Sequence, residues 1–274
     1  MQILELIKAA FLGIVEGVTE FLPVSSTGHL IIVDHFIKLS TDAHFVSAFE
    51  VVIQLGAILA IVVLFWKTLW PWATPASERS QTWQLWLRVI VGIIPAFILG
   101  FLLDKFITER LFNPIVVSIA LIFYGIVLIV MEHIFRRNPR ERSTLIYSMP
   151  LLTAFAIGLF QTLALIPGTS RSAATIIGGM VMGLGRAAAA EFSFFLAVPV
   201  MVGASGLTLM RQGLHFSAAE WVIMLVGFVV AFLCALVVVR AFMNYLRKRD
   251  FVPFGYYRIA LGVVVIAVLL VLKL

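Results

Sequence analysis

A polar break inside an apolar segment decides the fold, and it reads Glu16-Gly-Val-Thr-Glu20-Phe-Leu-Pro23-Val-Ser25-Ser26-Thr27-Gly28-His29. A second break, Gln161-Thr-Leu-Ala-Leu-Ile-Pro167-Gly168-Thr169-Ser170-Arg171-Ser172-Ala-Ala-Thr175, has the same order of apolar approach, proline and hydroxyl cluster. Each apolar piece beside a break is too short to cross about 30 Å of hydrocarbon. Irregular backbone at membrane depth is tolerated only where it is buried or lines a cavity. The pattern therefore predicts two re-entrant helical hairpins, within 1–38 and 147–184.

The composition is that of a membrane protein. Of 274 residues, 62% are hydrophobic and 12% charged, with a mean hydropathy of +1.10, whereas soluble domains carry about 25% charged residues. We expect one integral membrane domain over 1–274. The net charge of +6 does not indicate nucleic acid, because the basic residues sit in short loops that meet lipid headgroups. A single cysteine, Cys234, excludes a disulfide framework and a cysteine metal site.

Six further apolar segments predict spanning helices, at about 46–66, 85–104, 114–135, 189–210, 218–245 and 254–273. The two halves, about 1–110 and 147–250, form a pseudo-repeat in which Pro23 matches Pro167 and Ser25 falls on Thr169. Each unit is one hairpin plus three spans. Since three is odd, the second unit must insert upside down. The predicted fold is an all-α polytopic membrane protein with an inverted-topology repeat.

Basic residues orient this topology. One set of loops is rich in them, with Lys67, Arg79, Arg88, Arg136, Arg137, Arg140, Arg142, Arg240, Arg247, Lys248 and Arg249. The opposite loops carry few, namely Lys105, Arg110 and Arg211, with Asp104 and Glu109 beside the first two. The positive-inside rule makes the first set cytoplasmic. Both termini, and the entrance of the first hairpin, are then expected outside.

The hydroxyl clusters and the arginine predict a phosphate site. Helix N-termini offer free N–H groups and a positive dipole end, although Ser25, Ser26 or Ser170 could simply cap the following helix. The guanidinium of Arg171 stays charged and suits a phosphate. Arg186, nearer the hairpin exit, is expected to have a structural role.

Paired acids beside a histidine predict chemistry at the first break. Glu16 and Glu20 are four residues apart and share a helix face, so they suit a hard divalent cation, magnesium or calcium. One carboxylate could instead act as general base. On a helix His29 would approach the hydroxyl of Ser25 or Ser26. The nucleophile stays open between Ser26, His29 and metal-bound water.

These two motifs resemble the signatures of the bacterial undecaprenyl-pyrophosphate phosphatases of the bacitracin-resistance (BacA/UppP) family, and the resemblance extends over essentially the whole chain. It implies hydrolysis of undecaprenyl pyrophosphate to undecaprenyl phosphate and inorganic phosphate, which recycles the lipid carrier of peptidoglycan. It also implies a divalent cation, a plasma-membrane location, an active site that opens outward and lower bacitracin sensitivity. The family's catalytic set falls on Glu16, Glu20, Ser26, His29, Ser170, Arg171 and Thr175.

Within that set we expect the chemistry from Glu20, Ser26, His29 and Arg171, and a cation at Glu16 and Glu20. We expect phosphate contacts from Ser25, Thr27, Gly168, Ser170, Ser172 and Thr175. The expected partners are the lipid substrate and membrane lipids, and a homodimer stays open. The alternative function is a polyprenyl-phosphate flippase that uses the same phosphate-binding hairpins, because inverted repeats and broken helices are transporter features.

Overall fold

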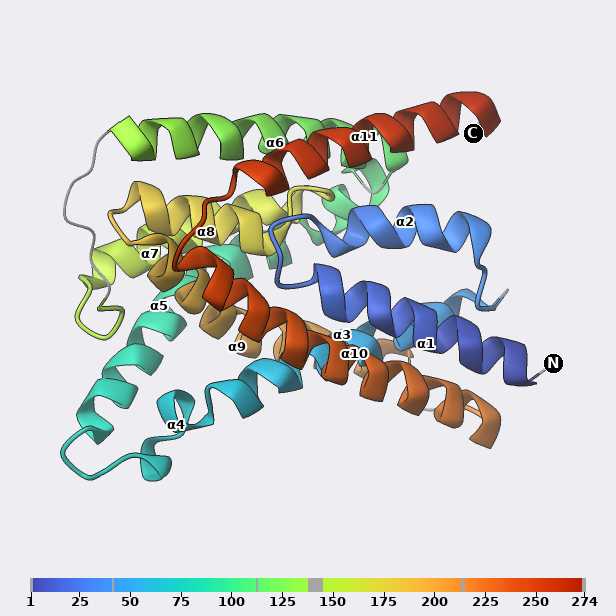
Figure 1. Ribbon diagram of the computed structural model, residues 1–274. Helices are drawn as coiled ribbons and strands as arrows, with labels where there is room; N and C mark the ends of the chain where they lie inside the picture. The colour runs from blue at the N-terminus through green and yellow to red at the C-terminus, as the bar shows by residue number, and fades with distance from the viewer. Residues whose placement is uncertain (1, 41, 112, 138–144, 213–214, 273–274) are drawn as a thin grey trace.

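The computed structural model describes residues 2–40, 42–111, 113–137, 145–212 and 215–272, and these form helices joined by turns and loops, without a strand (Figure 1). Arg140 and Arg142, used above for orientation, lie outside these residues. The helices are α1 Gln2–Thr19, α2 Ser26–Phe36, α3 Ala43–Leu64, α4 Trp66–Leu69, α5 Arg79–Phe106, α6 Pro114–Arg137, α7 Leu151–Thr162, α8 Arg171–Val181, α9 Arg186–Gln212, α10 Ala218–Leu246 and α11 Val252–Leu272. Single turns, η1 Pro71–Ala73, η2 Ile107–Leu111 and η3 Leu163–Leu165, complete the order.

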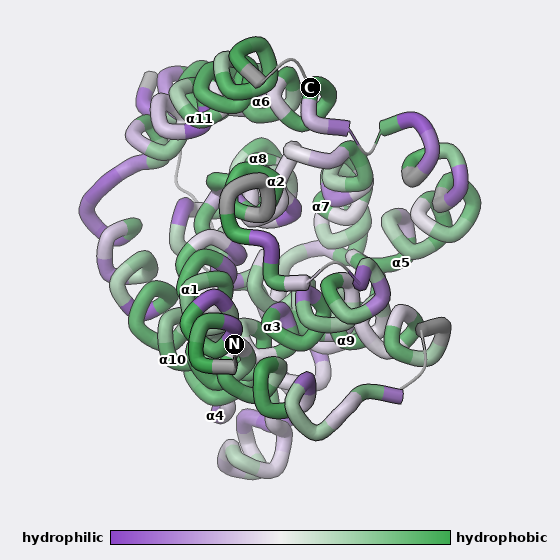
Figure 2. Tube along the Cα trace, turned by 90° about the vertical axis from the view of Figure 1, so that its right-hand side faces the viewer, coloured by the Kyte–Doolittle hydropathy of each residue, from purple (hydrophilic) through white to green (hydrophobic). Residues whose placement is uncertain are grey.

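Six helices are long and apolar enough to cross a membrane, which makes this a multi-pass membrane protein and confirms the six predicted spans. They are Ala43–Leu64, Arg79–Leu103, Pro114–Arg136, Arg186–Met210, Ala218–Leu246 and Val252–Val271. Their exposed residues include large apolar side chains such as Phe97 and Phe101, and Figure 2 shows that hydrophobic residues predominate along these helices. By contrast α2 and α8 have 11 residues each, about 17 Å of helix, which is short of the hydrocarbon thickness.

The short helices α2 and α8 lie inside a ring of longer ones (Figure 2). The ring is built from packed pairs: α1 on α10, α7 on α5, α3 on α9 and α6 on α11. Small residues allow the close approach of α1 to α10, because a Cβ on Gly17 would lie 2.5 Å from the carbonyl oxygen of Ala231. Gly13 of α1 is equally close, since a Cβ there would lie 2.6 Å from the carbonyl oxygen of Gly227 on α10.

The helix ends lie on two opposite sides of the bundle. Helix α1 begins and α11 ends on the same side, and the ends of α3, α6 and α10 lie on the opposite side (Figure 1). Helices α1 and α2 run antiparallel from the first side, whereas α7 and α8 do so from the second (Figure 1). The turns that join each pair meet in the interior, where the polar residues of both breaks gather.

Candidate active site

The two breaks form the same turn. Ser25 and Ser170 both have a φ of 71°, and within the described residues they are the only non-glycine positions with positive φ. Each then caps the next helix: Ser25 Oγ accepts from the Gly28 N–H at 3.4 Å and Ser170 Oγ from the Ala173 N–H at 3.3 Å. A serine held in this strained region needs support from its surroundings. Capping by both serines is thus confirmed.

This geometry corrects the predicted alignment of the repeat. Ser25 corresponds to Ser170 and not to Thr169, because the turn after Pro167 is one residue longer than the turn after Pro23. Aligning the two prolines therefore does not align the two cap residues. The loop between proline and cap differs in length, and each helix begins at its own cap.

Glu20 joins the two breaks. Its Oε2 accepts a hydrogen bond from Ser26 Oγ at 2.7 Å, and its Oε1 lies 3.3 Å from a terminal nitrogen of Arg171. The other terminal nitrogen of Arg171 donates to the carbonyl oxygen of Ser193 at 2.9 Å. The hydroxyl of Ser172 donates to the Leu22 carbonyl oxygen at 2.9 Å. Residues more than a hundred positions apart therefore form one continuous polar site.

Glu16 lies one turn before Glu20 and is fully buried. Both of its carboxylate oxygens lack a hydrogen-bond donor within the described part of the chain, and the charges of Glu20, Glu50 and Arg171 act on it. A buried carboxylate without a donor is costly, and a cation between Glu16 and Glu20 would compensate it. The described residues contain no group of three acidic, histidine or cysteine side chains able to hold a metal. Two carboxylates suit magnesium, which keeps several waters or phosphate oxygens as its other ligands.

His29 is placed differently from the expectation. Its Nδ1 is 2.7 Å from the carbonyl oxygen of Ser25, and its Nε2 is 2.6 Å from the hydroxyl of Tyr257. The predicted bond from the ring to a serine hydroxyl does not form, because Ser25 Oγ caps α2 and Ser26 Oγ points to Glu20. Tyr257, on α11, is a site residue that the sequence motifs did not indicate.

The remaining predicted phosphate ligands differ in burial and in the groups that they contact. Thr27 is half-buried in the first turn of α2, and Ser170 Oγ lies 2.9 Å from Ser172 Oγ. Gly168 has a φ of 90°, and a Cβ there would lie 2.5 Å from a carbonyl oxygen of α6. Thr175 is buried, and its hydroxyl is 2.6 Å from Ser193 Oγ, so it braces α8 against α9.

Arg258 was missed by the sequence analysis although it ties both turns together. Its side chain is fully buried on α11. It donates to carbonyl oxygens of Pro23 at 3.3 Å, Gly168 at 2.9 Å and Ala120 at 3.5 Å. The available signal was an arginine inside an apolar spanning segment, where charges are rare and usually paired.

A second ion pair, with a buried carboxylate and a partly exposed arginine, lies away from the site. Arg186 pairs with Glu132, with its Nε 2.9 Å from Glu132 Oε1, and it lies 4.7 Å above the ring of Phe135. Glu132 is fully buried on α6. The structural role expected for Arg186 is confirmed.

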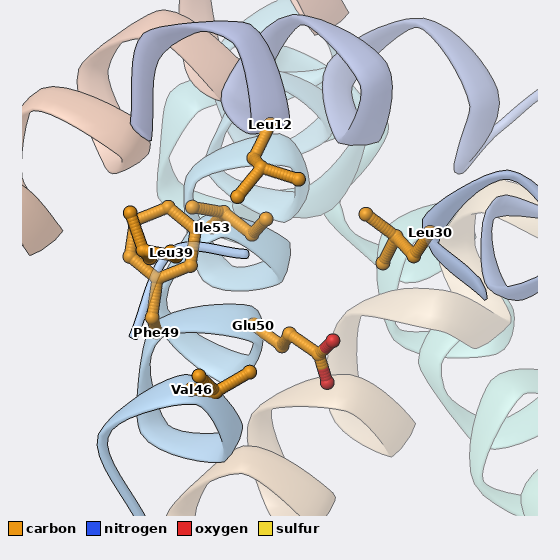
Figure 3. A pocket seen from close by; sticks show the side chains of 7 residues that line it. All are labelled: Leu12, Leu30, Leu39, Val46, Phe49, Glu50 and Ile53. Carbon is orange, nitrogen blue, oxygen red and sulfur yellow. The ribbon is translucent and has the colours of Figure 1, made fainter. Parts of the chain in front are cut away.

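A small apolar hollow lies beside the first break, between α1, α2 and α3. The side chain of Glu50 is the polar group in its wall and points toward Leu30 (Figure 3). The other lining residues are Leu12, Leu39, Val46, Phe49 and Ile53. The surroundings of Glu50 on this side of the first break are therefore apolar.

Comparisons with known proteins identify the family. The family model described as bacitracin resistance protein BacA matches residues 9–264. Undecaprenyl-diphosphatase 1 of Clostridioides difficile (strain 630) is 51% identical over 268 residues, 97% of each chain. Undecaprenyl-diphosphatase 1 of Oenococcus oeni is 50% identical over 268 residues, 96% of each chain, and undecaprenyl-diphosphatase of Enterococcus faecalis is 46% identical over 272 residues, 98% of each. With both motifs folded into one polar site and this likeness along nearly its full length, the chain belongs to the bacitracin resistance protein BacA family.

Proposed function

We propose that this protein is an undecaprenyl-pyrophosphate phosphatase that releases inorganic phosphate and undecaprenyl phosphate. The names of its relatives support the substrate. The observation that carries the proposal is the placement of Glu20 between the Ser26 hydroxyl and the Arg171 guanidinium. A hydroxyl bonded to a carboxylate is the arrangement of a nucleophile with its base, and a guanidinium beside it stabilises charge on a transferring phosphoryl group.

In the first step Ser26 Oγ attacks the terminal phosphorus and its proton passes to Glu20. The bond from this phosphorus to the bridging oxygen breaks, and undecaprenyl phosphate leaves. In the second step water attacks the same phosphorus and its proton passes to His29. The bond from phosphorus to Ser26 Oγ breaks, Glu20 returns its proton to that oxygen, and inorganic phosphate leaves. The Ser26–Glu20 bond favours the serine as nucleophile over the histidine.

The phosphates would be held where the two breaks meet. Arg171 and the free N–H groups in the first turns of α2 and α8 supply positive potential there. Glu16 and Glu20 would hold a divalent cation, Mg²⁺ or Ca²⁺, which supplies neutralising charge to the pyrophosphate.

The finer topology follows the same proposal. An inverted repeat would make the helices of one half equivalent to those of the other. The contacts agree with this: α1 packs on α10 as α7 packs on α5, and α2 contacts α11 as α8 contacts α6. Exposed basic residues just after α10, such as Lys248, support a cytoplasmic location for that side of the protein in a bacterial plasma membrane. Both chain ends and the entrance to α1 and α2 then face outward. A membrane-impermeant thiol reagent should label Lys248→Cys, in a chain without Cys234, only after permeabilisation.

The test of the function is phosphate release by detergent-purified protein given undecaprenyl pyrophosphate. Release should require magnesium or calcium and stop with EDTA. Glu20→Gln and Arg171→Ala should each abolish it, whereas Glu78→Gln and Arg240→Ala, at exposed positions, should keep the parent rate. All four variants should elute as the parent does on gel filtration.

Absence of release from folded parent protein in any divalent cation would contradict the phosphatase. If that protein still bound the lipid, the result would favour the flippase alternative, and translocation of the lipid in liposomes would be measured next. A flippase should tolerate Ser26→Ala better than Arg171→Ala, because translocation needs the anion held but no nucleophile.

A further inference from the structure

Five of the six tryptophans of the chain lie in one short segment, 66–86, which runs from the end of α3 into the first turns of α5. Both helices are long enough to span a membrane, over Ala43–Leu64 and Arg79–Leu103. The segment also holds α4 and η1, at the end of the bundle opposite the N-terminus (Figure 1). The tryptophans therefore gather where one span ends and the next begins, at the level of the lipid headgroups.

Four of these rings form an exposed series, which we call the tryptophan ladder. Trp66 and Trp70 are stacked, with centroids 5.1 Å apart and planes 13° from parallel. Trp72 and Trp83 continue the series at centroid distances of 5.2 and 6.0 Å. Each of the four residues is between 45% and 61% exposed. The ladder is thus a continuous aromatic surface and not a set of scattered side chains.

The opposite face of the segment is fixed to the protein. The indole N–H of Trp86 donates to the carbonyl oxygen of Leu69 at 2.7 Å, which ties α5 to α4. Leu69, Pro71 and Leu85 are buried. Within the described residues the four indole N–H groups of the ladder have no acceptor, unlike that of Trp86. The segment therefore has a packed face and a face of rings whose donors point to the surroundings.

Such a surface suits the boundary between lipid and water. In water the ladder would be an exposed apolar patch, and in hydrocarbon its indole N–H groups would be left without acceptors. In the headgroup layer the rings meet acyl chains while the N–H groups meet ester and phosphate oxygens.

The charges beside the ladder select the kind of lipid. Lys67 and Arg79 are both exposed. Over 66–88 the sequence has three basic residues and one acidic residue, Glu78. Basic residues close to a membrane surface attract anionic lipids.

We propose that the tryptophan ladder is a lipid-binding platform that lies in the headgroup layer and holds anionic phospholipid, with Lys67 and Arg79 next to the headgroup phosphate. It shares no residue with the polar site at the two breaks. Under the proposed orientation it lies in the cytoplasmic leaflet.

The position of the ladder can be tested by quenching of indole fluorescence with brominated lipids, in vesicles that hold the full chain. Trp221→Phe removes the one tryptophan outside the segment, so the remaining signal comes from the ladder and Trp86. Bromines close to the headgroup should quench this signal more strongly than bromines at the ends of the acyl chains. Equal or weaker quenching would overturn the placement: strong quenching by aqueous acrylamide would then show rings in water, and none by either quencher would show rings covered by a second copy of the chain.

The lipid preference is measured with the same signal. The vesicles contain equal amounts of phosphatidylglycerol and phosphatidylcholine, with bromine near the headgroup of one or the other. Quenching by brominated phosphatidylglycerol should be stronger by up to about fivefold, the scale of one basic residue near an anionic surface. Lys67→Gln together with Arg79→Gln should bring the ratio to about one.

The matched control removes the same charge at the far end of α5. Lys105→Gln together with Arg110→Gln changes two exposed positions there and should keep the parent ratio. An unchanged ratio after replacement of Lys67 and Arg79, or an equal loss in the control pair, would overturn the preference for anionic lipid. Neither measurement involves phosphate release, so both decide the platform whether or not the proposed function holds.

Discussion

Replacing Arg258 by lysine tests whether one buried guanidinium holds the two broken segments together. In the folded protein its two terminal nitrogens reach three carbonyl oxygens, on Pro23, Gly168 and Ala120. Lysine keeps the positive charge but has one nitrogen on a flexible stem, so it lacks the fork that spans both turns. Arg258→Lys therefore separates the bridging geometry from the charge.

The magnitude follows from the contacts. An ammonium that keeps one of the three bonds leaves two carbonyl oxygens without their donor. Side-chain hydrogen bonds in membrane proteins contribute about 0.6 kcal/mol on average and up to about 1.7 kcal/mol. Losing two should reduce the free energy of unfolding by about 1 to 3 kcal/mol. Because both turns lose their common tie, kcat for phosphate release should also fall, by at least about tenfold.

The assay is an SDS titration of protein in mild detergent, followed by circular dichroism, together with phosphate release. Arg240→Lys, at an exposed position on α10, is the matched control and should stay within about 0.5 kcal/mol of the parent. The reasoning is refuted if Arg258→Lys unfolds and turns over as Arg240→Lys does. Loss of turnover with unchanged stability would instead refute the estimate from lost hydrogen bonds.

Three further predictions use the same assays. Gly168→Ala should destabilise the protein by more than about 2 kcal/mol, because it combines a φ of 90° with a Cβ that would lie 2.5 Å from a carbonyl oxygen. Gly183→Ala is the control: its φ is 96° but no atom lies within 4 Å of the added Cβ, so it should cost only about 1 kcal/mol. Equal losses of stability in the two variants would contradict the clash at Gly168. Glu132→Ala should cost about 3 kcal/mol because it strands the charge of Arg186, yet phosphate release per folded molecule should persist. Magnesium at ten times its Kd should stabilise the parent by about 1.4 kcal/mol and leave Glu16→Gln unaffected; stabilisation of both would place the cation elsewhere.

Much of the architecture could be predicted because it depends on local properties. The six spans follow from apolar runs of sufficient length, and both breaks follow from proline and hydroxyls where such a run should continue. Glu16, Glu20 and Arg171 stand out because ionisable groups at membrane depth are rare, and the folded chain brings Glu20 and Arg171 into contact. These features need no knowledge of which helices are neighbours.

The contacts between distant segments could not be predicted. His29 and Tyr257 are 228 positions apart, and Arg258 and Pro23 are 235 apart, so no spacing rule relates them. The alignment of Ser25 with Thr169 failed for a related reason, since prolines can be matched by eye whereas the cap is decided by backbone conformation. Serine at a φ of 71° leaves no distinctive mark in a sequence.

The sequence by itself determined a membrane protein of six spans with two polar breaks and the residue types for phosphate chemistry, because hydropathy and charge act through each residue's own transfer energy. Only the tertiary structure decided that Ser26 pairs with Glu20, that His29 pairs with Tyr257, and that Arg258 joins the two turns. These partners are selected by packing, which sets the few ångströms over which a hydrogen bond forms or fails.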